Sequence, residues 1–422
     1  MYLSLSDRPT VGTPSEKQAG KRRPVGRVVV TLGIVSLLTD ISSESVSAIL
    51  PLYLTAVVGL SPVAYGFVDG LYQGVSALVR VAAGWGADRT NQPKWVAFVG
   101  YALSMVARFF LLFATGLTAI AGVISADRIG KGIRTAPRDA MISAETDPAH
   151  LGRAFGVHRT LDTIGAAIGP LVAFIVLWLI PDGYGTVMVV SLGFAVLGVA
   201  LLGLLVPGSA GRREASGTAA LPRAKSRFRW RDVATPQLTT LLVVAGVLGL
   251  LTVGDGFIYL ALLDSGGFAT HWFPVLYVGT NIVYLAFAIP LGRISDRVGR
   301  PRVLVLGHLA LAGAYVCAAA PFFGAATTIL ALAMLGTFYA ATDGVLSAIA
   351  STLVPSTVRA SGIASAQTVV AVARMVAAAG FGGLWFTMGP RLAMTVVAVA
   401  VVVVVPLALT AVLKLERSMV EA

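Results

Sequence analysis

The sequence is poor in charge and in cysteine. Only 12% of its 422 residues are charged, whereas 56% are hydrophobic and the mean hydropathy is +0.83. A soluble domain carries about 25% charged residues, so a soluble enzyme, a disordered chain and a coiled coil are excluded. The single cysteine, Cys317, excludes a disulfide framework and a cysteine metal site. What remains is a membrane protein with many spans.

The sequence also lacks the motifs of enzymes and metal sites. It contains neither H-E-x-x-H nor G-x-S-x-G, and its four histidines form no i,i+4 pair. Gly130-Lys131 resembles the end of a phosphate-binding loop, but Ser125 stands where that loop requires glycine. We therefore expect no catalytic activity, no cofactor and no metal site.

Long apolar runs indicate twelve transmembrane helices. A β-barrel is disfavoured because runs such as Met394 to Leu409 are apolar on every side. The predicted spans lie near residues 28–57, 62–86, 95–115, 117–141, 155–180, 186–207, 237–262, 271–291, 302–320, 325–349, 361–388 and 391–414. The predicted fold class is an all-α membrane protein in contact with the lipid bilayer.

Basic residues predict the orientation of the chain. They concentrate in alternate connections, around Arg89, Arg153, residues 208–236, residues 293–302 and Arg359. Cytoplasmic loops carry the excess of lysine and arginine. Both termini are therefore predicted to be cytoplasmic, in a multi-pass protein of the cell (inner or plasma) membrane. The net charge of +12 has the same explanation, so no nucleic-acid partner is expected.

The two halves of the chain repeat one pattern. Gly84-x-x-x-Asp88-Arg89 recurs as Gly292-x-x-x-Asp296-Arg297, and residues 153–156 match residues 359–362 at nearly the same spacing. Parallel halves with a central site are a transporter architecture. The predicted organisation is a cytoplasmic tail (1–27), a six-helix bundle (28–207), a basic linker (208–236), a pseudo-symmetric six-helix bundle (237–414) and a second tail (415–422).

At these residues the sequence resembles the major facilitator superfamily. The loop from Gly84 to Lys94 is similar to the signature between its second and third helices. Ile124-x-x-x-Arg128-x-x-Lys131-Gly132 resembles the fourth-helix motif of twelve-helix drug–proton antiporters. Gly165-x-x-x-Gly169-Pro170 resembles the antiporter motif of the fifth helix. The resemblance implies the major facilitator fold and secondary transport by alternating access, with proton coupling and export.

Two groups of residues are predicted to serve the conformational change. An aspartate at a helix end can oppose the positive end of a neighbouring helix dipole, so both Asp-Arg loops are predicted latches (Gly84, Asp88, Arg89, Gly292, Asp296 and Arg297). A solvated turn that only sets topology is the alternative. The resemblance implies that Gly165, Gly169 and Pro170 form a helix pivot. Small residues also serve ordinary close packing, and that alternative stays open.

Charges inside the spans are the strongest functional signal, since each costs about 2.5–3.5 kcal/mol at a helix centre. Asp40 and Glu44 share one face of the first span. The fourth span carries six charges, at residues 127, 128, 131, 134, 138 and 139, within an arc of roughly 140°. Pro137 predicts a kink or an early end of this helix near Ala136. The charges near the cytoplasmic ends favour a packing network.

Deeper in the membrane we expect function. Burial favours the neutral form of a carboxyl group and a nearby cation favours the charged form, so Asp40, Glu44 and Arg128 are predicted to couple protons. A cavity between the halves is predicted to bind substrate, through Arg108, Lys131, Asp255, Asp343 and Arg374.

The predicted function is transport of a small molecule by a monomer, coupled to protons, with export by antiport favoured. Proton-coupled uptake of a small organic or inorganic anion is the alternative, because arginines and Lys131 could form a cationic pocket. A membrane receptor with the same fold that does not transport is the alternative of another class.

Overall fold

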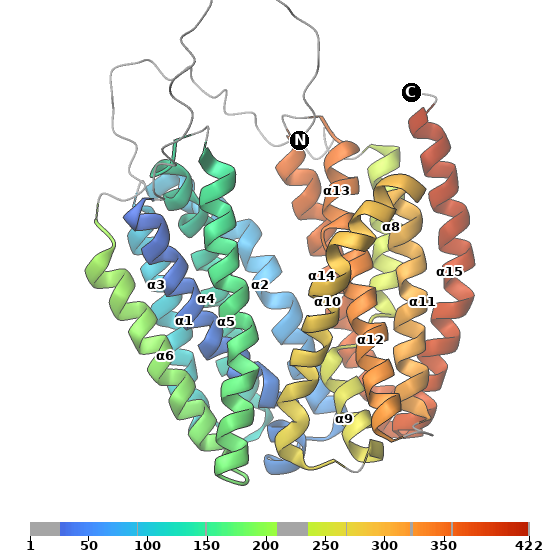
Figure 1. Ribbon diagram of the computed structural model, residues 1–422, viewed down its shortest axis with the longest axis horizontal. Helices are drawn as coiled ribbons and strands as arrows, with labels where there is room; N and C mark the ends of the chain where they lie inside the picture. Colours follow the sequence, from blue (N-terminus) through green and yellow to red (C-terminus); the bar gives the residue numbers. More distant parts are fainter. Residues whose placement is uncertain are drawn as a thin grey trace, which may run out of the picture.

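The computed structural model describes residues 26–90, 92–147, 150–208, 235–266, 268–320, 324–355 and 358–420 (Figure 1). Within these ranges the chain is helical and contains no strand. The all-α prediction is therefore confirmed. Most of the predicted tail (1–27) and linker (208–236) lies outside the described residues.

The first half forms one bundle. Its helices are α1 (Arg27–Leu52), which continues as the π-helix η1 (Tyr53–Val57), α2 (Pro62–Thr90), α3 (Pro93–Leu111), α4 (Gly116–Ala144), α5 (Leu151–Leu179) and α6 (Tyr184–Leu205). Proline occupies the first turn of α3, where its missing N–H group has no partner to lose.

The second half forms the other bundle. Its segments are α8 (Pro236–Leu250), α9 (Asp255–Gly266), η3 (Thr270–Trp272), α10 (Phe273–Val298), α11 (Arg300–Ala319), α12 (Ala325–Thr342), α13 (Val345–Thr352), α14 (Arg359–Met388) and α15 (Pro390–Val420). Among the described residues, ten helical stretches are long and apolar enough to cross a membrane. The more polar helices α2 and α4 are as long, which accords with twelve spans.

The two bundles lie side by side, and α1 begins on the same face on which α15 ends (Figure 1). We call this the terminal face and the opposite one the distal face. Helix α15 continues to Val420, so it extends through most of the segment predicted as a tail (415–422).

Three helices differ from the prediction. Of the kink or early end expected near Ala136 in the fourth span, the early end is wrong, because α4 continues past Pro137 to Ala144. Neighbouring helices in a membrane bundle can satisfy the backbone groups that a proline frees. The seventh span is interrupted at residues 251–254, between α8 and α9, and the tenth at Asp343 and Gly344, between α12 and α13. Gly344 has φ +78°, which a side chain would disfavour.

The bundles touch each other near the distal face. Helix α2 packs along α14, where a side chain at Gly66 would overlap the backbone of Ala378, and one at Gly382 would overlap Pro62. Helix α5 meets the second bundle where Phe174 lies 5.1 Å from Trp272, between ring centroids. Helix α5 also packs against α10. By the repeat, α2 corresponds to α10 and α5 to α14, so the α2–α14 and α5–α10 contacts are pseudo-symmetric.

Candidate functional site

Two adjoining cavities lie between the bundles, of about 500 Å³ and about 390 Å³. Both bundles line them, and the two cavities share Gln73, Thr252, Tyr284, Asp343 and Arg374. The larger cavity extends towards the terminal face, past Arg159, Ser347 and Gln367. The smaller one, which we call the acidic cavity, lies deeper. Together they form a central chamber of the size that holds a small ligand.

Carboxyl groups dominate the acidic cavity. Its described lining contains four of them, Glu44 from α1, Asp69 from α2, Asp255 from α9 and Asp343, against one guanidinium group, that of Arg374. The hydroxyl of Tyr339 donates a hydrogen bond of 2.6 Å to Asp255. The remaining lining is rich in tyrosine, at positions 72, 259, 277 and 284. Negative charge and aromatic faces together suit a cation.

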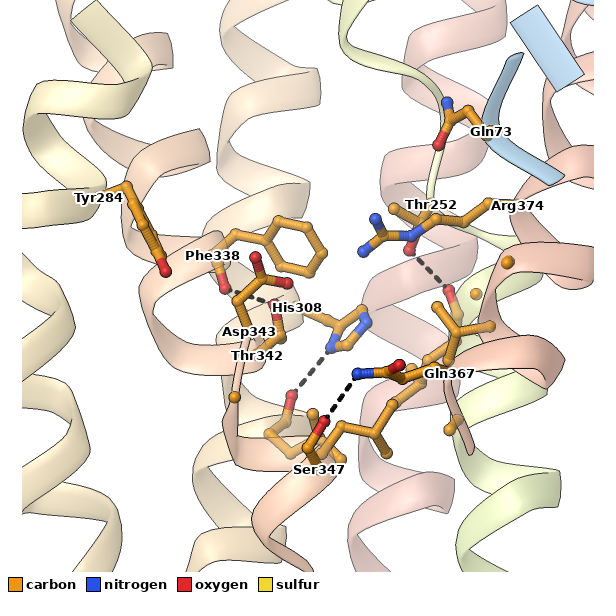
Figure 2. Close-up of a pocket in the computed structure, with 18 of the residues that line it drawn as sticks. Gln73, Thr252, Tyr284, His308, Phe338, Thr342, Asp343, Ser347, Gln367 and Arg374 are labelled. Carbon is orange, nitrogen blue, oxygen red and sulfur yellow. Dashed lines mark hydrogen bonds between the residues drawn. The ribbon is translucent and has the colours of Figure 1, made fainter. Parts of the chain in front are cut away.

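Arg374 lies where the two cavities join. Figure 2 shows its guanidinium group and the Asp343 carboxylate within the same cavity. The guanidinium carbon is 5.9 Å from the ring centroid of Tyr339 and 6.0 Å from that of Phe338. Its Nε is buried and has no hydrogen-bond partner in the described part of the chain. Arg374 is therefore a cation that a ligand at the junction of the two cavities would meet.

Two of these acids lie at the helix interruptions. Asp255 is the first residue of α9 and Asp343 follows the last residue of α12. The hydroxyl of Tyr315 holds the first interruption open, because it donates to the carbonyl of Leu251 (2.9 Å) and accepts from the N–H of Val253 (2.8 Å). Non-helical backbone at membrane depth is tolerated where it lines a cavity, and such interruptions form binding sites in transporters.

The charges of α4 pair with acids of α1, α4 and α5. Asp127 contacts both Arg108 (3.3 Å) and Arg128. One turn further, Lys131 lies 3.8 Å from Glu44, and Arg134 lies 3.8 Å from Asp40. Near the terminal face Arg138 pairs with Asp139 (3.1 Å) and Asp162 (3.9 Å), and Arg159 also pairs with Asp162. The stripe predicted from the sequence is thus a ladder of ion pairs inside the first bundle.

The structure separates the predicted substrate residues into two groups. Asp255, Asp343 and Arg374 line the acidic cavity, whereas Arg108 and Lys131 line neither of the two cavities. Arg108 donates to Ser42 (2.6 Å) inside the first bundle. Lys131 pairs with Glu44, which does line the acidic cavity.

The predicted coupling residues border the chamber in different ways. Glu44 lines the acidic cavity. The Arg128 guanidinium carbon lies 3.7 Å from the ring centroid of Tyr72, which lines the cavity too. Asp40 is placed towards the terminal face, beside Arg134. Their roles stay predictions.

Replacing Asp127 by asparagine should lower the stability of the protein more than the same replacement of Asp139, at the exposed end of the ladder. Arg108 and Arg128, each about 5% exposed, would lose their counter-charge, and removing one partner of a buried ion pair costs about 3–5 kcal/mol. Thermal unfolding in detergent would measure the loss. Asp139→Asn is the matched control, since its side chain is 43% exposed. Equal melting temperatures for both variants would contradict this reading.

The predicted pivot lies inside the first bundle. A side chain at Gly165 would come within 2.5 Å of the carbonyl oxygen of Leu37, and one at Gly169 within 2.8 Å of the N–H of Ser45. These glycines therefore let α5 pack directly on α1, beside the residues of the ion-pair ladder. Pro170 follows within α5. The contact agrees with close packing, and the pivot stays a prediction.

The two predicted latches differ in how much of them the structure describes. Gly84, Asp88 and Arg89 belong to the last turns of α2, but their side chains lie outside the described residues. In the second copy, Asp296 accepts a hydrogen bond of 2.8 Å from Arg300 in the same loop and is 58% exposed. Gly292 and Arg297 are at the same end of α10. Asp296 is thus paired within its own bundle, and both latches stay predictions.

Several cavity residues were not predicted as substrate-binding. On α10, Tyr277, Thr280, Asn281 and Tyr284 line the acidic cavity. They recur at i, i+3, i+4 and i+7, so a polar face on an apolar helix was available as a signal. Asp69 and Gln73 have the same spacing on α2, and Gln73 donates to Asp69 (3.1 Å).

Comparisons with known proteins agree with this architecture. The family model described as Major Facilitator Superfamily matches residues 32–280. An uncharacterised MFS-type transporter of Methanocaldococcus jannaschii is 30% identical over 380 residues, which cover 88% of this chain and 91% of that protein. Among solved structures, a mutant of the nucleoside transporter NupG has a TM-score of 0.78 at 15% identity, covering 91% of this chain and 100% of that one. A mutant of a peptide transporter POT, in complex with alafosfalin, has a TM-score of 0.75 at 15% identity, covering 92% of this chain and 95% of that one.

Proposed function

The chain belongs to the Major Facilitator Superfamily, and on that premise we propose that this secondary transporter exports a small organic cation in exchange for protons. Membership makes it a multi-pass membrane transporter of small molecules and not an enzyme. The substrate, the coupling ion and the direction are the proposed part. So are its two-bundle domain boundaries, its action as a monomer and its place in the cell membrane with cytoplasmic termini.

One observation supports the cationic substrate above all others. The described lining of the acidic cavity has four carboxyl groups and a single guanidinium group. The tyrosines beside them offer aromatic faces, which attract a cation most when the site is desolvated. A carboxylate that binds a cation can also bind a proton. Competition between the two for one site is sufficient to couple their movements.

Proton coupling is supported by the two looser ion pairs of the ladder. Glu44 and Lys131, like Asp40 and Arg134, are 3.8 Å apart, whereas Asp127 is held by two arginines at once. A weakly held carboxylate that borders the chamber can exchange a proton with it. Glu44 meets this condition, since its side chain is 29% exposed.

Uptake of a small anion is the second candidate, and Arg374 favours it. Its Nε has no hydrogen-bond partner in the described part of the chain and lies in the cavity, so a carboxylate or phosphate could bind there. Of the other cations predicted to form an anion pocket, Arg108 and Arg128 are paired with Asp127 and Lys131 with Glu44.

Everted membrane vesicles test the proposal. With an acidified lumen, vesicles that contain the protein should accumulate ethidium, and benzoate should neither accumulate nor compete. Collapse of the pH gradient should release the ethidium. Vesicles with Asp182→Asn provide the control, because Asp182 lies in the distal turn between α5 and α6, outside the cavities. Gradient-driven movement of benzoate without ethidium would instead support the anion candidate.

A further inference from the structure

We propose that Asp69 is a further proton-binding site, which locks the two bundles together at the distal side while its carboxylate is charged. The site lies between α2 of the first bundle and the start of α9 in the second. It rests on the proposed proton coupling but uses none of the acids that the ion-pair ladder holds.

The Asp69 carboxylate lies against the backbone at the interruption of the seventh span. A Cβ atom on Gly254 would overlap Oδ2 of Asp69, and it would lie 2.9 Å from Nε2 of Gln73. Only a residue without a side chain leaves this space. Gln73 donates to the same Oδ2 at 3.1 Å and so fixes the carboxylate against the backbone of the other bundle.

A second side chain of α2 enters the same place. Tyr65, one turn before Asp69, is 2% exposed. Its hydroxyl occupies the space that a Cβ atom on Gly256 would need, and it has no hydrogen-bond partner in the described part of the chain. Gly254 and Gly256 flank Asp255, the first residue of α9. This pair of glycines thus receives two polar side chains from the opposite bundle.

The local field explains why charge should matter here. The first N–H groups of a helix have no partners within it, and the N-terminus carries a partial positive charge that stabilises an anion. A charged Asp69 is therefore held at the start of α9. Protonation removes the charge and weakens this contact between the bundles, which allows the distal side to open.

In the described part of the chain, the other charged and titratable groups around Asp69 leave it without a direct counter-ion. Asp255 faces it from α9, Tyr277 from α10 and Glu44 from α1, while Tyr65 and Tyr72 belong to its own helix. Arg374 from α14 lines the same cavity, and Arg128 from α4 stacks on Tyr72. The acids outnumber the bases, which favours uptake of a proton at this site.

The lock suits an exchanger. An empty carrier with a charged Asp69 stays closed at the distal side and cannot slip, whereas a protonated carrier can reorient. Exchange then requires that a proton or a substrate neutralise the site on each crossing.

Distances between spin labels on the distal side test the lock without requiring transport. The labels would be placed at Thr115, before α4, and at Thr387, near the end of α14, both exposed. The single native cysteine, Cys317, would first be replaced by alanine. In lipid nanodiscs, lowering the pH from about 8 to about 5 should convert the short distance of the wild type into a longer one. The ratio of long to short distances should rise about tenfold.

Three variants make the test specific. Asp69→Asn should show the long distance at both pH values, and Gly254→Ala should do the same by excluding the carboxylate. Asp343→Asn, which removes an acid from the cavity but not from the α9 contact, should keep the wild-type pH response. An unchanged distance and pH response in Asp69→Asn would overturn the proposal, as would an equal effect of Asp343→Asn.

These results are separable from those of the proposed function. If the distance in nanodiscs depended on pH but vesicles containing the protein moved no ethidium, the lock would stand and the export proposal would fall. If Asp69→Asn kept the wild-type distances and transported ethidium under the pH gradient at the wild-type rate, the export proposal would stand and the lock would fall.

Discussion

Replacing Gly382 by leucine should arrest the transporter with its distal face open. At this position α14 touches the backbone of α2, and even a Cβ atom would overlap the carbonyl of Pro62. The contact joins two bundles that each have their own packing, so the added side chain is expected to push the bundles apart without unfolding either. Alternating access requires both closed states. Transport should therefore fall at least a hundredfold while the protein remains in the membrane.

The neighbouring residue supplies a matched control. A side chain at Gly383 would meet nothing within 4 Å, so Gly383→Leu should transport normally. Ethidium accumulation in vesicles would measure activity, and the label pair at Thr115 and Thr387 would report the longer distal distance. Full activity of Gly382→Leu would show that the α2–α14 contact is not the distal gate.

Neutralising both looser acids, by Asp40→Asn together with Glu44→Gln, should abolish proton-driven transport while leaving passive exchange. The variant could still bind substrate at Asp255 and Asp343, which line the cavity in the other bundle. It could no longer release or take up protons at the ladder. Gradient-driven accumulation should fall at least a hundredfold, whereas exchange of labelled for unlabelled substrate should persist.

The single variants separate coupling from stability. Glu44→Gln should have the larger effect, since Glu44 borders the cavity and Asp40 does not line it. Asp40→Asn also frees Arg134, whose Nη1 is already without a hydrogen-bond partner among the described residues, so its thermal stability should fall more than that of Glu44→Gln. If the double variant kept full gradient-driven accumulation, the ladder would serve packing alone.

The fold was largely predictable because the thickness of a membrane sets the length of every helix that crosses it. Each span needs about 20 apolar residues, and the predicted runs near 28–57 and 325–349 match α1 with η1 and α12 with α13 closely. The repeated Asp-Arg loops indicated that the chain consists of two similar halves. The ends of the helices were harder: Pro137 suggested an end near Ala136, but packing within the bundle carries α4 on to Ala144.

The cavity was predictable only in part, because hydropathy does not show which residues face one another. Asp255, Asp343 and Arg374 were found as charges inside spans, and all three line it. Arg108 and Lys131 carried the same signal, but they line neither cavity. Arg108 pairs with Asp127 inside the first bundle, and Lys131 pairs with Glu44. The spacing of Gly66, Gly70 and Gly74 resembles a helix-packing motif, yet only the structure shows that its partner is α14.

The measurement that tests the central claim most directly is the lumenal pH of proteoliposomes that contain the purified protein. With a pH-sensitive dye inside an acidic lumen, addition of ethidium outside should make the lumen more alkaline, because protons leave as the cation enters. Liposomes containing the double variant Asp40→Asn, Glu44→Gln should show no such change. A lumen that stays at its starting pH while ethidium accumulates, or one that responds to benzoate alone, would contradict proton-coupled export of a cation.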